Sequence, residues 1–356
     1  MFKRILVPLD GSELAERALP VAARIARTSA GTIVFVRVVL PPVEFGTYSV
    51  EQEHLIDLKP SAFERRLAEA ESYLLNVAIT HADVLAGIAT ETDIVTGATA
   101  PEIISTARLE KIDLIVMCSH GETGLKRWVF GSVAQEAVRH SPAPVLVLNG
   151  HVTFLRVPDA AHPLRVLVAL DGSALSETAL EPAIRLLTTW TNAPTEVGGE
   201  LHLLHVVDVP PAYGKFRSQA YFPDSLRNEV RQEAETYVKA VADRLLAGPL
   251  AGSQLTVTSG IYLSTDVAGT MIKMAEHAEN AEHTGGYDLI AMATHGRSGL
   301  RRLVMGSITE HVLGATTLPL LIVRPPEIKT RPEKATEAAQ TEVGAQAEEQ
   351  GWVGLL

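Results

Sequence analysis

The chain has 356 residues, of which 46% are hydrophobic and 21% are charged, so it is long enough for two domains with proper cores. Its 42 acidic residues outnumber its 31 basic residues and give a net charge of −11. This balance argues against a sequence-independent nucleic-acid binder, which needs a basic face, and against a protein that docks on anionic membranes.

Short runs rich in β-branched residues alternate with longer helical patterns along the first half of the chain. Several of these runs are continuously apolar, as in parallel strands that are covered on both faces. The expected order is strand 5–9, helix 13–28, strand 32–39, helix 61–81, a weak strand 88–95, helix 100–111, strand 114–118, helix 132–139 and strand 145–148. This order predicts an α/β fold with a doubly wound, mostly parallel five-stranded sheet and helices on both faces.

The second half of the chain repeats the first. The string RILVPLDGS at residues 4–12 recurs as RVLVALDGS at 165–173, and DLIVMCSHG at 113–121 recurs as DLIAMATHG at 288–296. Such self-similarity is the signature of a duplicated unit. We therefore predict the following organisation: domain 1 at residues 1–150, a linker at 151–163, domain 2 at 164–326 and a disordered tail at 327–356.

The offset between matched positions grows along the chain in two steps of seven residues, so domain 2 carries two insertions. The first surrounds residues 192–199, which are rich in turn-forming residues, and it predicts a lengthened loop. The second lies near residues 279–286, where we expect it to extend the end of a helix before the fourth strand.

Two loops hold candidate ligand-binding residues, because open parallel sheets bind ligands at the carboxyl ends of strands where the strand order reverses. The first is the Asp-Gly-Ser turn after the first strand of each domain, with Asp10 and Asp171. Its acid and hydroxyl can cap the next helix, and the carboxylate can also accept hydrogen bonds from a nucleoside. Capping alone is the commoner role, and a duplication copies caps as readily as binding sites.

The second loop, after the fourth strand of domain 2, indicates a phosphate site. Gly296 and Gly299 permit a tight turn that brings backbone amides close to phosphate oxygens. Residues 306–308 begin a helix, whose unsatisfied amides and dipole favour an anion. Nearby positive charge comes from Arg297, Arg301 and Arg302.

These features resemble the universal stress protein domain, whose nucleotide-binding members share the motif Gly-x2-Gly-x9-Gly-(Ser/Thr). Gly121 with residues 131–132 matches the last two elements in domain 1, and Gly296 with residues 306–307 matches them in domain 2. The resemblance covers nearly the whole chain apart from the linker and the tail. It implies an adenine nucleotide alpha hydrolase-like fold and an ATP ligand, with or without Mg²⁺.

The resemblance also implies site residues by position. On the nucleoside side they are Pro8, Asp10 and Val38 in domain 1 and Ala169, Asp171 and Val206 in domain 2. On the phosphate side they are Gly121, Gly131, Ser132 and Val133 in domain 1 and Gly296, Arg297, Gly299, Gly306, Ser307 and Ile308 in domain 2.

Both domains depart from the motif at its first glycine, which is Cys118 in domain 1 and Ala293 in domain 2. Alanine adds only a methyl group, whereas cysteine is larger. In addition, Glu122 in domain 1 occupies the position of Arg297 and places a negative charge beside the phosphate loop. We therefore expect domain 2 to bind ATP and domain 1 to bind it more weakly or to be vacant.

Other conspicuous residues receive structural interpretations. His120 and His295 have no companions at metal-ligand spacing, so we predict no metal site and assign both to loop stabilisation. Cys118 has no activating neighbour in the sequence and is expected in the core. The long segments 41–60 and 208–224 can fold over a nucleotide, form a partner surface or be variable loops.

The location of the protein is expected to be cytoplasmic. The apolar run at the N-terminus ends within a few residues at Pro8 and Asp10, which is too short for a signal peptide, and no run approaches the roughly 20 apolar residues of a membrane span. The single cysteine allows no intrachain disulfide, as is usual in a reducing compartment.

The leading functional hypothesis is a non-enzymatic module in which ATP occupancy favours one of two conformations and so signals stress. One alternative is an interaction protein in which neither site binds nucleotide. Another is a slow ATP-hydrolysing or phosphoryl-transferring enzyme, for which no positioned general base is evident. The family resemblance further implies that the closing strands of the two domains pair as an internal pseudo-dimer, and a homodimer of the whole chain is compatible with this arrangement.

Overall fold

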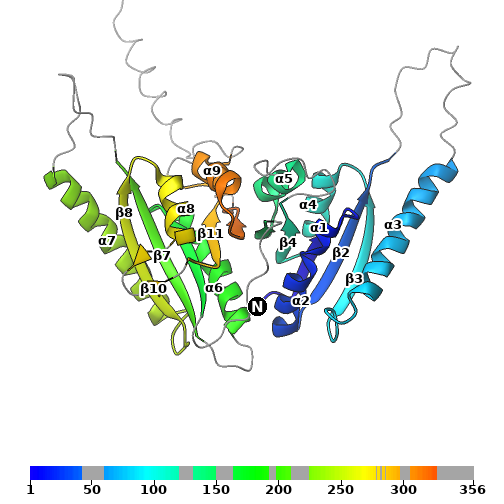
Figure 1. Ribbon diagram of the computed structural model, residues 1–356, viewed down its shortest axis with the longest axis horizontal. Coiled ribbons are helices and arrows are strands. Elements are labelled where there is room, and N and C mark those ends of the chain that lie inside the picture. The colour runs from blue at the N-terminus through cyan, green and yellow to red at the C-terminus, as the bar shows by residue number, and fades with distance from the viewer. Residues whose placement is uncertain are drawn as a thin grey trace, which may run out of the picture. The chain divides into compact units, whose positions relative to one another are not determined.

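The computed structural model places the core of both domains in one compact unit, Met1–Pro325 (Figure 1). The linker before Pro163 and the tail 327–356 lie outside the described residues, so the predictions made for them stay predictions. The structure describes residues 1–41, 60–119, 131–149, 163–191, 198–209, 224–277, 279–280, 283–284, 286–296 and 305–326.

A single ten-stranded sheet runs through both domains, in the order β3-β2-β1-β4-β5-β12-β11-β6-β7-β8. Within each domain all neighbouring strands are parallel, which confirms the predicted five-stranded sheet. The strands of domain 1 are β1 (Arg4–Pro8), β2 (Thr32–Val39), β3 (Ala89–Thr96), β4 (Leu114–Cys118) and β5 (Val145–Leu148). Those of domain 2 are β6 (Leu164–Leu170), β7 (Gly199–Asp208), β8 (Thr256–Ser264), β11 (Leu289–Ala293) and β12 (Leu320–Val323).

Helices cover both faces of the sheet, as a doubly wound fold requires. One face carries α2, α3, α6 and α7, and the other carries α4, α5, α8 and α9, each over its own hydrophobic core. In domain 1 the helices are α1 (Glu13–Glu16), α2 (Leu19–Ser29), α3 (Pro60–Thr80), α4 (Thr99–Leu109) and α5 (Ser132–His140). In domain 2 they are the short 3₁₀ helix η1 (Ser176–Ala179), α6 (Leu180–Thr191), α7 (Asp224–Ala247), α8 (Val267–His277) and α9 (Ser307–Ala315).

The two domains join where β5 pairs with β12, the one antiparallel pair of the ten-stranded sheet. Leu146 lies opposite Leu321 in this pair, and neither side chain is exposed. Each hydrophobic core continues across this seam with residues from both domains. The pairing of the closing strands that the resemblance implied is therefore present within the chain.

The prediction of one continuous helix over residues 13–28 was wrong, because the segment is divided into α1 and α2. Pro20 lies in the first turn of α2. Proline has no N–H to continue the helical hydrogen bonds of α1, whereas its fixed φ suits the first turn of a new helix.

The second insertion of domain 2 was also predicted wrongly, since it forms a two-stranded hairpin of β9 (Glu279–Asn280) and β10 (His283–Thr284) instead of extra helix. The amide of Tyr287 donates to the carbonyl of Ala275 at 2.7 Å, and the matched amide of Ile112 donates to Ala107 at 2.9 Å. Because both domains keep this helix-ending bond, the additional residues leave the helix and return as a hairpin. Residues 192–197 of the first insertion lie outside the described residues.

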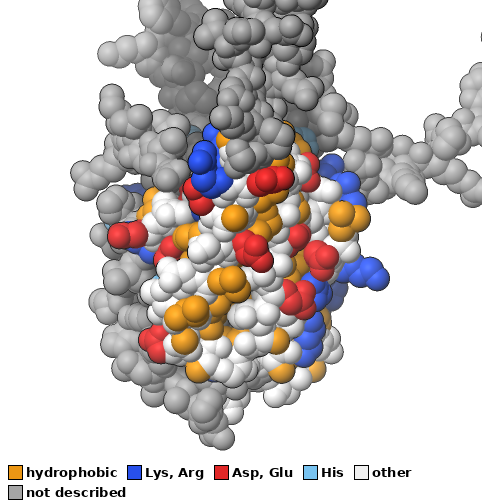
Figure 2. Space-filling model, turned by 90° about the vertical axis from the view of Figure 1, so that its right-hand side faces the viewer, with side chains coloured by type: hydrophobic (Ala, Val, Ile, Leu, Met, Phe, Trp, Pro, Cys, Tyr) orange, Lys and Arg blue, Asp and Glu red, His pale blue; other side chains and the backbone are white. Residues whose placement is uncertain are grey.

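The outer face of domain 1, around α3 and the edge strand β3, mixes acidic, basic and hydrophobic side chains (Figure 2). Leu75 and Ile79 of α3 are exposed by 54% and 73%. On β3 itself, Glu91 pairs with Arg4 of β1 at 2.8 Å. Charged and threonine side chains on an edge strand disfavour pairing with a further strand, so the sheet ends here.

Candidate functional site

The Asp-Gly-Ser turn has the same geometry in both domains. Gly11 has a φ of +95° and its counterpart after Asp171 has +84°, a conformation that favours glycine. Oδ1 of Asp10 accepts hydrogen bonds from the amide and hydroxyl of Ser12 at 3.0 and 2.6 Å, and Asp171 does the same for its serine at 2.9 and 2.6 Å. Ser12 Oγ in turn accepts from the amide of Ala15 at 3.1 Å. The predicted capping role is thus observed, and it uses only one of the two carboxylate oxygens of each aspartate.

In domain 2 the two predicted loops meet. A Cβ atom added at Gly296 would collide with Oδ2 of Asp171, so the carboxylate lies directly against the backbone after β11. This proximity follows from the sheet, because β6 and β11 are neighbouring parallel strands and their carboxyl ends lie at the same edge. The counterpart Gly121 lies outside the described residues, as do Arg297 and Gly299.

The helix that begins each predicted phosphate site starts identically in the two domains. Gly131 is the N-cap of α5 with φ −62° and ψ 140°, and Gly306 is the N-cap of α9 with φ −63° and ψ 142°. Their amides donate to the carbonyls of Ser119 and Thr294 at 2.8 and 2.9 Å. Because glycine has no side chain, neither N-cap offers an oxygen to the first-turn amides, which stay available to an anion.

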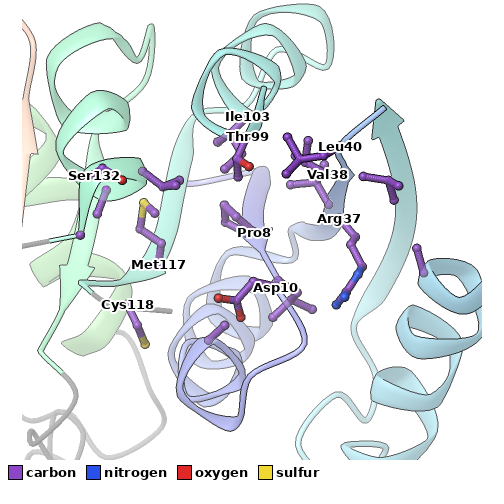
Figure 3. Close-up of a pocket in the computed structure, with 18 of the residues that line it drawn as sticks. Pro8, Asp10, Arg37, Val38, Leu40, Thr99, Ile103, Met117, Cys118 and Ser132 are labelled. Atoms are coloured by element: carbon purple, nitrogen blue, oxygen red, sulfur yellow. The ribbon is translucent and has the colours of Figure 1, made fainter. Parts of the chain in front are cut away.

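A cavity of about 730 Å³ lies at the carboxyl edge of the sheet in domain 1 (Figure 3). This volume is within the range of small-molecule sites. The cavity lies over the ends of β2, β1 and β4, which are adjacent in the sheet, and β1 and β4 are the strands between which the order reverses. Six residues predicted for the domain 1 site line it: Pro8, Asp10, Val38, Gly131, Ser132 and Val133.

Four further residues of the cavity wall were missed by the sequence analysis. Thr99 and Ile103 come from the start of α4 and Met117 from β4, positions that carry no recognisable motif. Arg37 comes from β2 and immediately precedes Val38, the residue of this strand that was predicted for the site. In Figure 3, Asp10 and Pro8 lie in the middle, with Arg37 on one side and Ser132 and Cys118 on the other.

Cys118 is part of the cavity wall and does not fill the cavity. It is only 7% exposed, and burial raises the pKa of its thiol to about 12. A thiol with so high a pKa is a poor nucleophile at neutral pH. The predicted core role of this residue therefore agrees with its position.

In domain 2, Ala169 on β6 and Val206 on β7 are both 6% exposed and lie on the same face as α8 and α9. Ser307 and Ile308 form the first turn of α9, and Ile308 is 36% exposed. The hydroxyl of Thr309 donates to the carbonyl of Ala293 at 3.1 Å and so ties this helix to the end of β11.

His295 participates in the loop after β11, where its Nδ1 atom lies 2.9 Å from the hydroxyl of Thr294. This contact is the kind of loop stabilisation predicted for it, and His120 lies outside the described residues. Across the described ranges, no group of three or more His, Cys, Asp or Glu side chains is placed to hold a metal ion. Likewise, none of the helices described combines the length and apolar character needed to cross a membrane.

Both halves of the chain are similar in sequence to one known protein family. The model of the universal stress protein family matches residues 1–149 and again residues 164–324. A universal stress protein of Mycolicibacterium smegmatis is 24% identical over 329 residues, covering 90% of this chain and 97% of its own length. Universal stress protein MJ0577 of Methanocaldococcus jannaschii is 33% identical over 162 residues, covering 42% of this chain and 96% of its own.

Solved structures show the same fold. A universal stress protein from Archaeoglobus fulgidus aligns with a TM-score of 0.57 and 20% identity, covering 90% of this chain and 98% of its own. The alignment spans both halves of the chain, so the tandem arrangement has a counterpart of known structure.

Proposed function

This chain belongs to the universal stress protein family, and we propose that it is a regulatory member that binds adenine nucleotide at the carboxyl edge of its sheet. The observation that carries the proposal is the cavity of domain 1, because six residues assigned to nucleotide binding by position line one space of about 730 Å³. Nothing in the sequence pattern required these residues to enclose a space large enough for a ligand.

The chemistry of the cavity fits a nucleotide. Apolar side chains such as Val38 and Ile103 supply a surface for a flat base, and Asp10 supplies a carboxylate for ribose or base hydrogen bonds. The uncapped start of α5 supplies amides for phosphate oxygens. Domain 2 repeats the turn, the strand pairing and the helix start, so the proposal extends to a second site there.

We expect ATP to bind more tightly to domain 2 than to domain 1. The phosphate loop of domain 2 has Arg297 where domain 1 has Glu122, and positive charge beside a triphosphate strengthens binding. Thr309 also fixes the start of α9 through its bond to Ala293, whereas domain 1 has Ala134 at the matched position and cannot form that bond.

The proposed role is signalling in the cytoplasm and not turnover. ATP occupancy is proposed to favour one conformation of the loops that surround each site, and a ligand shifts such an equilibrium by its difference in affinity for the two states. Mg²⁺ is proposed to accompany ATP through the phosphates themselves.

The proposal is tested by calorimetric titration of nucleotide-free protein with ATP and Mg²⁺, comparing wild type with Gly306→Asp. Aspartate at the N-cap of α9 brings negative charge and bulk to the phosphate position, where an added Cβ already lies 3.3 Å from the carbonyl of Thr294. Gly314→Asp is the matched control, because this exposed position near the end of α9 has open space around an added Cβ.

Saturable binding by wild type and by Gly314→Asp, weakened in Gly306→Asp, is the expected result. Absence of ATP binding to well-folded wild-type protein would overturn the proposal. The chain would then be best described as an interaction protein that has kept the family fold without its ligand.

A further inference from the structure

In both domains, a tyrosine–glutamate hydrogen bond holds the short helix that follows the Asp-Gly-Ser turn. Tyr73 of α3 donates its hydroxyl to Glu16 at 2.9 Å, and Tyr237 of α7 donates to Glu177 at 3.1 Å. In each domain the tyrosine ring also lies beside one side chain from the second strand of the sheet. Around this tyrosine, the side chain from the second strand differs in chemical type between the two domains.

In domain 1 the side chain is Arg37, and in domain 2 it is His205. The Cζ atom of Arg37 lies 4.6 Å from the centre of the Tyr73 ring, within the range of a cation–π contact. The ring of His205 lies edge-on to Tyr237, with 5.7 Å between centroids. Domain 1 therefore has a permanent positive charge where domain 2 has an imidazole.

The hydrogen bonds that hold the Asp-Gly-Ser turn do not require an arginine at this position. Domain 2 builds the same turn, with the same hydrogen bonds to Asp171, around a histidine. Moreover, Nη1 of Arg37 is buried and has no hydrogen-bond partner among the residues that the structure describes. It packs against Gly11, where an added Cβ would lie 2.7 Å from it. A buried guanidinium nitrogen without an acceptor is unfavourable, so an anion bound beside Arg37 would stabilise this group.

Arg37 forms part of the cavity wall, on the opposite side of β1 from the start of α5 (Figure 3). The nearby wall residues from α3, Arg66 and Glu69, are exposed and of opposite charge, so together they add little net charge. The cavity consequently has a positive group at each end, the amides at the start of α5 and the guanidinium of Arg37, with the carboxylate of Asp10 between them (Figure 3).

We propose that Arg37 determines the ligand specificity of domain 1 by pairing with a second anionic group, so that this domain selects nucleotides with a phosphate at each end, such as a nucleoside 3′,5′-bisphosphate. The inference rests on the proposed function, since the first phosphate occupies the nucleotide site at α5. A planar guanidinium can bind a phosphate through two parallel hydrogen bonds, which a neutral imidazole cannot do.

The test compares adenosine 5′-monophosphate with adenosine 3′,5′-bisphosphate by calorimetric titration of the full chain. Gly306→Asp is included in every protein so that the site of domain 1 dominates. The expected result is that the bisphosphate binds about tenfold more tightly than the monophosphate, as one additional charge-assisted contact allows. In Arg37→His, which copies the residue of domain 2, this ratio falls to about one.

The reciprocal variant keeps the test decisive if Arg37→His folds poorly. His205→Arg, combined with Gly131→Asp to disable domain 1, is expected to give domain 2 a preference for the bisphosphate. An unchanged ratio in a folded Arg37→His protein, or equal affinities in the parent, overturns the inference while the proposed function stands. If neither these ligands nor ATP binds the wild-type chain, the proposed function itself fails.

Discussion

Domain 1 and domain 2 share one backbone geometry at their candidate sites, and individual side chains there differ. The amide of the N-cap glycine donates to the strand end at 2.8 Å in one domain and 2.9 Å in the other. Two matched side chains differ, however. Arg37 of domain 1 corresponds to His205 of domain 2, and Cys118 corresponds to Ala293. Backbone geometry is held by many hydrogen bonds at once, whereas a single side chain at a cavity wall can change without disturbing them.

The backbone framework also extends across the two domains, because β5 and β12 join their sheets and their cores. Differences between the domains therefore occur within one continuous sheet.

Removing core volume at the seam is expected to destabilise both domains. Leu321 is fully buried opposite Leu146, and a Leu→Ala change at such a site costs about 2–5 kcal/mol. Chemical denaturation of Leu321→Ala should show one transition at lower denaturant concentration. Leu246→Ala, at a position that is 47% exposed, is the control and should differ little from wild type. Two separate transitions, of which only one shifts, would show that the domains are independent.

The thiol of Cys118 is expected to resist alkylation. Burial raises its pKa from 9.0 to about 12, so the thiolate fraction near pH 8 falls by roughly a thousandfold relative to an unfolded chain. Labelling with iodoacetamide, followed by mass spectrometry, should be slow in the native protein and fast in guanidinium. Because folding favours the protonated thiol, its contribution to stability is complete below the unfolded pKa of 9.0 and is lost as pH rises toward 12. Rapid native labelling at pH 8 is incompatible with the observed burial.

A side chain at Gly296 is expected to disable domain 2 selectively. An added Cβ would collide with the carboxylate of Asp171, so Gly296→Ala must displace either the aspartate or the loop. We expect a stability loss of about 1–3 kcal/mol and ATP affinity in domain 2 reduced by about tenfold. Titration calorimetry measures the affinity, with Gly314→Ala as the control at a position with open space. Unchanged affinity would mean that Asp171 takes no part in the site.

The smallest effect is expected from the ion pair that crosses the seam. Arg139 of α5 lies 2.6 Å from Glu310 of α9, and both side chains are partly exposed at 27% and 41%. The matched positions of the other domain are Gly314 and Gln135, so the pair has no symmetric counterpart. Glu310→Gln should change the free energy of unfolding by less than about 1 kcal/mol. The difference should shrink in 1 M salt, and a larger, salt-independent loss would show that the pair is structurally essential.

The fold was largely predictable because its signals are local and are present twice. Continuous apolar runs such as residues 114–118 and 145–148 match β4 and β5 residue for residue. The failures arose where a tertiary constraint decided the outcome. Pro20 ended one helix and began another, and the bond between Tyr287 and Ala275 forced an insertion out of α8.

The candidate site was predictable only as far as its motif extends. Glycine and Asp-Gly-Ser positions follow from backbone chemistry, and those within the described residues lie at the expected strand and helix ends. Arg37 and Thr99 were not predictable, because only the three-dimensional packing of β2 and α4 brings them to the cavity. The sequence also gave no indication that Cys118 would line the cavity without filling it.

We propose that each domain has its own nucleotide site at the carboxyl edge of its half of the sheet. The most direct test is the stoichiometry of ATP binding to wild type, Gly131→Asp, Gly306→Asp and the double variant, measured by titration calorimetry on nucleotide-free protein. We expect two sites in wild type, with the tighter one lost in Gly306→Asp and the weaker one lost in Gly131→Asp, and none in the double variant. Undiminished ATP binding by a folded double variant would contradict it, because the ligand would then occupy a place other than these two helix starts.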